Sequence, residues 1–177
     1  MTQIKKAVVF GGSGFIGHYV VKHLADLGAQ VHIPTRNAER AALLKTYGTP
    51  GQISTEEVNI LQPDALRAQI EPADTVVNCI GVLFERGKAT FPMMHHQLPK
   101  MIAESCQQFG IRRLVHISAL GIEAAAASSS YAKSKLQGEE AVQSSLPEAV
   151  ILRPSVVFGR EDNFINQFAK MAMYSPA

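Results

Sequence analysis

The chain carries AVVFGGSGFIG at residues 7–17, where a short apolar run leads into glycines with the spacing GxxGxxG. This order predicts a strand, a tight turn and the start of a helix. Glycine lets the backbone approach a phosphate without a Cβ in the way, and the N–H groups and positive dipole end of a helix N-terminus attract the anion. The stretch therefore predicts a pyrophosphate site of a bound dinucleotide, the alternative being a glycine-rich turn without a ligand. The residues expected to contact the dinucleotide are Gly11, Gly14, Phe15, Ile16 and Gly17.

The composition is typical of one soluble domain. The 177 residues suffice to bury a core, and the net charge of +2 is carried by scattered basic residues, so we expect no nucleic-acid partner. No apolar stretch approaches the length that spans a bilayer, and the N-terminus lacks the apolar core of a signal peptide, which predicts a cytoplasmic protein. Cys79 and Cys106 match neither a disulfide framework nor a metal-ligand spacing, and the adjacent His95 and His96 diverge on a helix, so we expect no metal site.

Apolar β-branched runs alternate with helical patterns along the chain, as in βαβ units. The strands expected from this alternation are 6–10, 30–34, 54–59, 75–80, 113–118 and 149–153. The expected helices are 15–27, 38–47, 63–70, 92–109, 129–145 and 162–174. Right-handed crossovers then predict an α/β fold with a doubly wound parallel sheet in the order 3-2-1-4-5-6, the Rossmann fold. The small-residue stretch 124–130 is expected to be a flexible loop that ends in a serine N-cap.

Ligands of such sheets bind beyond the carboxyl ends of the strands, and the fifth strand is followed there by Tyr131 and Lys135 at the spacing YxxxK. Residues four apart lie on one face of a helix. A nearby lysine cation stabilises a phenolate, so we expect it to lower the pKa of the tyrosine and make it an acid/base catalyst. A surface tyrosine beside a solvated lysine is the alternative.

The motifs together resemble a known family, the extended and atypical short-chain dehydrogenase/reductases, also called the NAD-dependent epimerase/dehydratase family. They are GxxGxxG, NCIG at 78–81, HISALG at 116–121, YAKSK at 131–135 and RPSVVFG at 153–159. A closer resemblance, to the branch related to the nucleotide-binding accessory subunit of respiratory complex I, rests on 8–17, 116–121, 131–139 and 153–164.

The resemblance implies roles for further residues. Tyr131 would be the acid/base and Lys135 its partner, and both would contact the cofactor. Asn59 and Ile60 would flank the adenine. The nicotinamide half would lie over Cys79, Ile80 and Gly81 and be braced by Pro154, Ser155 and Val156. Ser118 stands near the position of the serine or threonine that polarises the substrate carbonyl; it either fills this catalytic role or simply ends the fifth strand.

Cofactor preference can be argued from the end of the second strand. An acidic residue there binds the ribose 2′-OH of NAD, whereas an arginine suits the 2′-phosphate of NADP. The chain has Arg36 at this point and no acidic residue before Glu39, so we expect NADP(H) to be favoured over NAD(H). A solvated arginine in the loop is the alternative.

Members of the family continue into a lobe that closes over the substrate. We therefore expect a dinucleotide-binding domain over 1–160 and the start of a truncated C-terminal substrate lobe over 161–177, so that the chain is a fragment or lacks most of the substrate site. The apolar stripe Phe164, Ile165, Phe168, Met171 and Ala172 either packs on the rest of the same protein or docks at a membrane or a respiratory partner.

Two functional hypotheses follow. The first is an NADP(H)-dependent oxidoreductase or epimerase/dehydratase that acts on a small-molecule substrate the sequence does not identify. The second is a non-catalytic nucleotide-binding accessory or assembly protein linked to complex I or quinone metabolism, peripheral at the inner face of a membrane. A redox-sensing regulator has less support because YxxxK is intact. The resemblance also allows a homodimer through the fourth and fifth helices.

Overall fold

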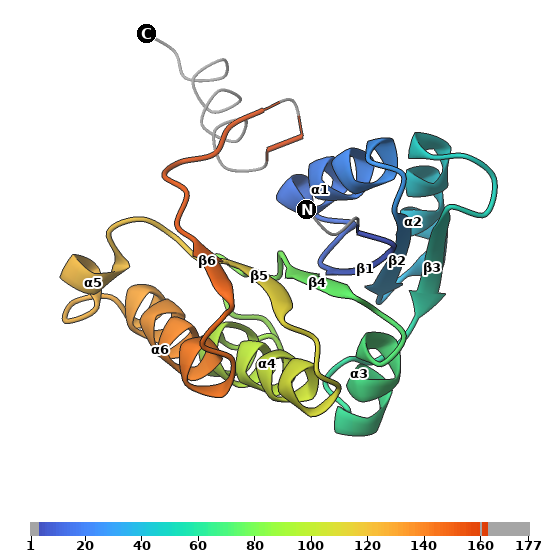
Figure 1. Cartoon of the computed structure of the whole chain (residues 1–177). Coiled ribbons are helices and arrows are strands. Elements are labelled where there is room, and N and C mark those ends of the chain that lie inside the picture. The colour runs from blue at the N-terminus through green and yellow to red at the C-terminus, as the bar shows by residue number, and fades with distance from the viewer. Residues whose placement is uncertain (1–3, 160, 163–177) are drawn as a thin grey trace, which may run out of the picture.

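The computed structural model describes residues 4–159 and 161–162 as a parallel sheet covered by helices (Figure 1). The strand order is β3-β2-β1-β4-β5-β6, and every neighbouring pair is parallel. The predicted doubly wound, Rossmann-like sheet and its order are thereby confirmed. The strands are β1 (Lys6–Phe10), β2 (Gln30–Thr35), β3 (Ile53–Glu57), β4 (Thr75–Asn78), β5 (Arg113–Ile117) and β6 (Val150–Leu152).

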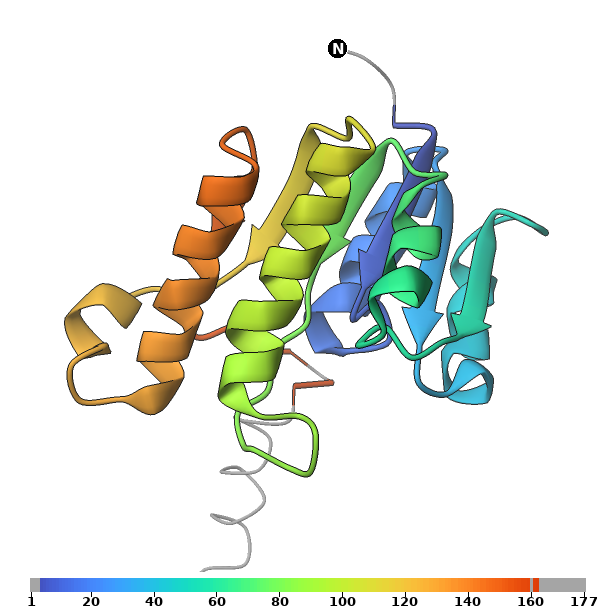
Figure 2. The ribbon, with the colours of Figure 1, turned by 90° about the horizontal axis from the view of Figure 1, so that it is seen from below.

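Helices cover both faces of the sheet. One face carries α1 (Phe15–Asp26) and α2 (Ala38–Ala41), which continues as the 3₁₀-helix η1 (Ala42–Tyr47). The other face carries α3 (Pro63–Ile70), α4 (Leu98–Gln108) and α6 (Ser130–Ser145), which Figure 2 shows side by side. The remaining elements are η2 (Pro92–Gln97), which leads into α4, and α5 (Ile122–Ala125).

Two hydrophobic cores explain why β1 is apolar from Ala7 to Phe10. Val8 and Phe10 pack into the core beneath α3, α4 and α6, whereas Ala7 and Val9 pack into the core beneath α1. Successive side chains of a strand point to opposite faces, so a strand that is buried on both sides needs apolar residues at every position. The glycine-rich turn after β1 is consequently anchored at the centre of the sheet.

The helix expected over 92–109 does not begin as a regular α-helix. Residues Pro92–Gln97 form π-helical turns before α4 starts at Leu98. Pro99 has no N–H to donate to the carbonyl of His95, four residues earlier, and a proline ring clashes with the carbonyl at that distance in an α-helix. The proline therefore widens the helix at His95, a change that the apolar periodicity alone does not reveal.

Two further expected elements need correction, and a third lies outside the described residues. The expected helix over 38–47 is divided between α2 and η1. The stretch 124–130 contains the end of α5, although Ser129 does cap α6 as predicted, accepting a hydrogen bond from the Ala132 N–H at 3.3 Å. The expected helix over 162–174 falls outside the described residues except for Asp162. Within the described part of the chain, no helix combines the length and apolarity needed to cross a membrane.

Candidate dinucleotide-binding site

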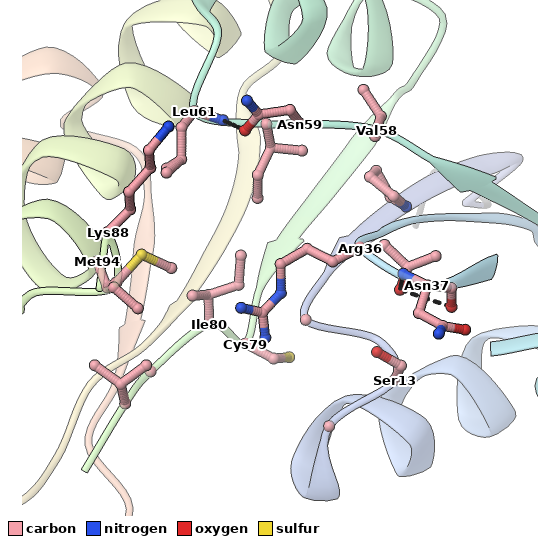
Figure 3. A pocket seen from close by; sticks show the side chains of 18 of the residues that line it. Ser13, Arg36, Asn37, Val58, Asn59, Leu61, Cys79, Ile80, Lys88 and Met94 are labelled. Atoms are coloured by element: carbon pink, nitrogen blue, oxygen red, sulfur yellow. Dashed lines mark hydrogen bonds between the residues drawn. The ribbon is translucent and has the colours of Figure 1, made fainter. Parts of the chain in front are cut away.

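A cavity of about 520 Å³ opens at the carboxyl edge of the sheet. Its walls are the glycine-rich turn after β1, the end of β2 and the segments that follow β3 and β4 (Figure 3). This is the place where the strand order reverses, from β1 to β2 on one side and from β1 to β4 on the other. The predicted site residues among those that line it are Gly11, Gly14, Arg36, Asn59, Ile60, Cys79, Ile80 and Gly81.

The glycine-rich turn is shaped for close backbone approach. Gly11 has φ +75°, and a Cβ built on it would lie 3.0 Å from the backbone carbon of Cys79 and the backbone nitrogen of Ile80. Gly14 is the N-cap of α1, and no side chain caps that helix N-terminus. The first N–H groups of a helix have no partner within the helix. The turn therefore offers uncapped donors and a positive dipole end to an anion, which fits the pyrophosphate of a dinucleotide.

Gly17 has a packing role instead of lining the cavity. It is buried, and a Cβ on it would lie 2.0 Å from the carbonyl oxygen of Gly11 and 2.7 Å from the Cα of Gly12. Only glycine lets α1 lie this close to the turn. Phe15 and Ile16 form the first turn of α1, where backbone N–H groups have no partner within the helix, and neither residue lines the cavity.

The β2 and β3 side of the cavity is polar and basic. In Figure 3 the Arg36 side chain extends from the end of β2 toward Cys79 and Ile80. The Oδ1 atom of Asn59 accepts a hydrogen bond from the Leu61 N–H at 3.2 Å, which fixes the turn after β3. The lining contains no aspartate or glutamate, and it includes three basic residues that the sequence motifs did not indicate: Arg40, Arg86 and Lys88.

Tyr131 lies in the first turn of α6, half-buried against two aromatic rings. Phe91 and His95 meet its ring edge-on, with centroid distances of 5.7 and 5.2 Å. This burial raises the pKa of the Tyr131 phenol. The predicted lowering of that pKa by Lys135 is therefore wrong for the structure as it stands, because desolvation dominates.

Lys135 is buried one helical turn further along α6. Its Nζ donates a hydrogen bond to the carbonyl oxygen of Ile117, at the end of β5, over 2.8 Å. Burial lowers the pKa of the Lys135 ammonium to about 8, partly offset by the Glu139 carboxylate. The lysine thus ties α6 to the carboxyl end of β5.

Ser118 follows β5 directly and is only 5% exposed. Its backbone N–H donates to the Leu152 carbonyl at 2.7 Å, while its Oγ has no hydrogen-bond partner among the described residues. A buried hydroxyl without a partner is costly unless another group satisfies it. The hydroxyl is buried in this structure, and the expected contact of Ser118 with a substrate oxygen stays a prediction.

The segment after β6 crosses the carboxyl edge of the sheet. The Leu120 N–H donates to the Pro154 carbonyl at 2.9 Å, and Val156 is 62% exposed. The cavity that holds the glycine-rich turn does not include these residues or the α6 pair: Ser118, Tyr131, Lys135, Pro154, Ser155 and Val156. The predicted residues thus fall into two groups, of which the first lines the cavity and the second, from the ends of β5 and β6 and from α6, does not.

His95 is a structural member of this site that sequence reasoning did not identify. Its Nε2 accepts a hydrogen bond from the Val82 N–H and its Nδ1 contacts the Ser134 hydroxyl, each at 3.0 Å. The Ser134 hydroxyl donates to the Tyr131 carbonyl at 2.7 Å, so Nδ1 carries the proton. Burial lowers the pKa of His95 to about 4, which keeps the ring neutral. His95 therefore joins the loop after β4 to the helix that carries Tyr131.

Metal ligation has no support in the described part of the chain. No group of three or more histidine, cysteine, aspartate or glutamate residues is placed there to hold an ion. His116 is buried in the core of the sheet, with its Nδ1 3.0 Å from the Asn78 amide nitrogen, and burial lowers its pKa to about 3.

The fold and the cavity define a nucleotide-binding α/β domain of the doubly wound type. The profile of the NAD dependent epimerase/dehydratase family matches residues 7–174, and the chain belongs to this family. A mouse protein, NADH dehydrogenase (ubiquinone) 1 alpha subcomplex subunit 9, mitochondrial, is 38% identical over 164 residues. That match covers 92% of this chain and 43% of the mouse protein, so the chain spans less than half of this relative's length.

Solved structures agree on the fold. UDP-glucuronic acid 4-epimerase from Bacillus cereus, in complex with NAD, superposes with a TM-score of 0.71 at 20% identity over 93% of this chain and 64% of that one. Yeast methylglyoxal/isovaleraldehyde reductase, complexed with NADPH, gives a TM-score of 0.71 at 19% identity over 88% and 59%. Membership in the family implies a dinucleotide cofactor. Of the two solved structures, the epimerase contains NAD and the reductase contains NADPH.

Proposed function

We propose that this chain is the NADP(H)-binding domain of an oxidoreductase or epimerase/dehydratase in which Tyr131 and Lys135 carry the proton chemistry. The main support for NADP(H) is that Arg36 lies at the end of β2, in a cavity whose lining has no carboxylate. A guanidinium matches the oxygens of a 2′-phosphate as a two-pronged donor. A carboxylate in the same place would favour the 2′-OH of NAD instead.

The remaining binding roles are those that the family resemblance implies, for residues in the cavity and in the segment after β6. The N-terminus of α1 and the backbone at Gly11 and Gly14 hold the pyrophosphate, and Asn59 with Ile60 flanks the adenine. The segment after β4 supports the ribose of the nicotinamide half, and the nicotinamide itself is braced by Pro154, Ser155 and Val156.

The chemistry depends on the bound cofactor and on α6. A bound nicotinamide supplies a hydride donor or acceptor at its C4 atom. Tyr131 exchanges a proton with a substrate hydroxyl or carbonyl, and Ser118 donates a hydrogen bond to the same substrate oxygen. The Lys135 ammonium stabilises the phenolate when the tyrosine gives up its proton. Burial raises the pKa of Tyr131, so in this structure the phenol holds its proton more tightly than a free tyrosine does.

A second candidate function is an accessory protein of a respiratory assembly, in which the bound dinucleotide stabilises the fold without turnover. The similarity to the mouse relative, a subunit of NADH dehydrogenase, favours it. The raised pKa of Tyr131 and the hydrogen bond from Lys135 to the Ile117 carbonyl are also compatible with a structural role for both side chains.

The first test is thermal denaturation with NADPH, NADP⁺, NADH and NAD⁺ in turn. A ligand that binds only the folded state raises the melting temperature. We expect a larger rise with the NADP forms. Arg36→Ala should weaken NADPH binding by about tenfold or more, since a charged hydrogen bond contributes about 1.5–3 kcal/mol, and should change NADH binding little. The control is Arg112→Ala, an exposed arginine before β5 and outside the cavity. If Arg36→Ala weakens NADPH and NADH binding equally, the argument for a preference for NADP(H) fails.

The second test separates the two candidates. Tyr131→Phe in an enzyme should lower turnover by about 10²–10⁴-fold, the usual contribution of a general acid, with the Kd for NADPH nearly unchanged. For an oxidoreductase, turnover is measured as NADPH oxidation with a panel of aldehydes and ketones. For an epimerase or dehydratase, which returns the hydride to its substrate, it is measured as chromatographic conversion of nucleotide sugars. An accessory protein should bind NADPH and convert none of these compounds, in the wild type as in the variant.

A further inference from the structure

The loop between β4 and η2, residues 83–91, brings two basic side chains to the cavity. Arg86 and Lys88 line it together with Gly14 and Arg36. Neither belongs to the glycine-rich turn or to the end of β2. Figure 3 shows Lys88 on the side of the cavity that also carries Leu61 and Met94.

The 83–91 loop is a built element. The backbone N–H of Arg86 donates to the Ala89 carbonyl at 3.1 Å, and the Ala89 N–H donates back to the Arg86 carbonyl at 3.0 Å. Gly87, between them, has φ +57°, a conformation that suits glycine. At the base of the loop the ring of Phe91 stacks on His95 with centroids 5.3 Å apart. The backbone therefore determines where the two cations project.

The charges of this loop are not neutralised within the described part of the protein. Arg86 and Lys88 form no ion pair there, and the carboxylate of the neighbouring Glu85 accepts a hydrogen bond from the Phe91 N–H at 2.7 Å. Elsewhere exposed cations such as Lys22 and Lys100 have carboxylate partners one turn away. A cavity lined by uncompensated positive charge attracts polyanions.

The strand order places these charges on two sides of the phosphate site. The sequence of neighbours β2-β1-β4 puts the glycine-rich turn, which follows β1, between the end of β2 and the loop that follows β4. Arg36 and Arg40 belong to the segment after β2, whereas Arg86 and Lys88 belong to the loop after β4. The turn is thus flanked in the sheet by two segments that each bring two cations to the cavity.

We propose that the 83–91 loop is a phosphate-binding arm, in which Arg86 and Lys88 contact phosphate oxygens of the bound dinucleotide from the β4 side. The ligand class is an adenine dinucleotide, whose pyrophosphate and 2′-phosphate present the same oxygen chemistry. This inference rests on the proposed function, because the cavity must first bind a dinucleotide. It adds two binding residues and a basis for specificity that the motifs of the chain do not contain.

The test is the double variant Arg86→Gln/Lys88→Gln, with Lys5→Gln/Lys45→Gln as the control that removes the same charge outside the cavity. Isothermal titration gives the Kd for NADPH and for NADH at low and high salt, and circular dichroism melts show that each variant folds. We expect the Kd for NADPH to rise about tenfold at low salt in the arm variant, and less at high salt, since exposed charges are screened.

Each outcome has a distinct meaning. If the arm variant loses more affinity for NADPH than for NADH, the arm contacts the 2′-phosphate. If it loses the same affinity for both, the arm contacts the pyrophosphate. If the arm variant binds both dinucleotides as tightly as the control, the arm is overturned while the proposed function stands. If the wild type binds neither dinucleotide, the proposed function fails at the outset.

Discussion

Gly138→Ala should destabilise this protein, although the local sequence suggests the opposite. Gly138 lies inside α6, where alanine is the better helix former by about 1 kcal/mol. A Cβ on Gly138, however, would lie 1.8 Å from the carbonyl oxygen of His95 and 3.0 Å from its carbonyl carbon. Both atoms belong to the backbone of η2, so no side-chain rotation relieves the clash.

The magnitude follows from the displacement that the clash requires. An ordinary contact needs at least 3.4 Å, so α6 and η2 must separate by more than 1 Å where they now touch. Overpacking by one methyl group costs about 1–3 kcal/mol, and a backbone neighbour places this site at the upper end. After the helix-propensity gain, we expect a net loss of about 2 kcal/mol and a melting temperature lower by about 4–8 °C.

The assay is urea and thermal denaturation followed by circular dichroism, with Gln137→Ala as the control. Gln137 is the exposed neighbour of Gly138 on α6, and its replacement should change stability by less than about 0.5 kcal/mol. Because α6 also carries Tyr131 and Lys135, the displaced helix should weaken the stabilisation by NADPH. A Gly138→Ala protein that melts at or above the wild-type temperature would refute the close packing of α6 on η2.

The remaining predictions concern the turn and the buried lysine. Gly17→Ala puts a Cβ 2.0 Å from the Gly11 carbonyl oxygen. We therefore expect the unfolding free energy, measured with urea, to fall by several kcal/mol, and NADPH to leave the melting temperature of the variant unchanged. A normal NADPH-induced rise in melting temperature would contradict the packing role of Gly17. Burial lowers the pKa of Lys135 from 10.5 to about 8, so between these values the unfolded chain binds more protons than the folded one. The unfolding free energy should therefore rise over this window by about 1 kcal/mol per pH unit. The control is Lys135→Met, which lacks the titrating group. Parallel pH profiles of the two proteins would show that burial does not lower the pKa of Lys135.

Much of the architecture was predictable because it depends on local patterns. The continuous apolar run of β1 and the glycines after it require a buried central strand and a tight turn. The alternation of strands and helices, with right-handed crossovers, then leaves few sheet orders. The π-helical turns of η2 were harder to foresee, although Pro99 carries the signal: a proline without an N–H affects the helix one turn before it.

The sequence by itself determined the parallel sheet, its order and the position of the glycine-rich turn, since these follow from hydrophobic periodicity and glycine spacing along the chain. Only the tertiary structure decided the environment of the side chains. It buries Tyr131 against Phe91 and His95 and directs Lys135 to the Ile117 carbonyl. It also brings the 83–91 loop to the same cavity as Arg36. Burial and charge at a point in space are sums over residues distant in the sequence, so pKa shifts and the basic walls of the cavity emerge only when the chain is folded.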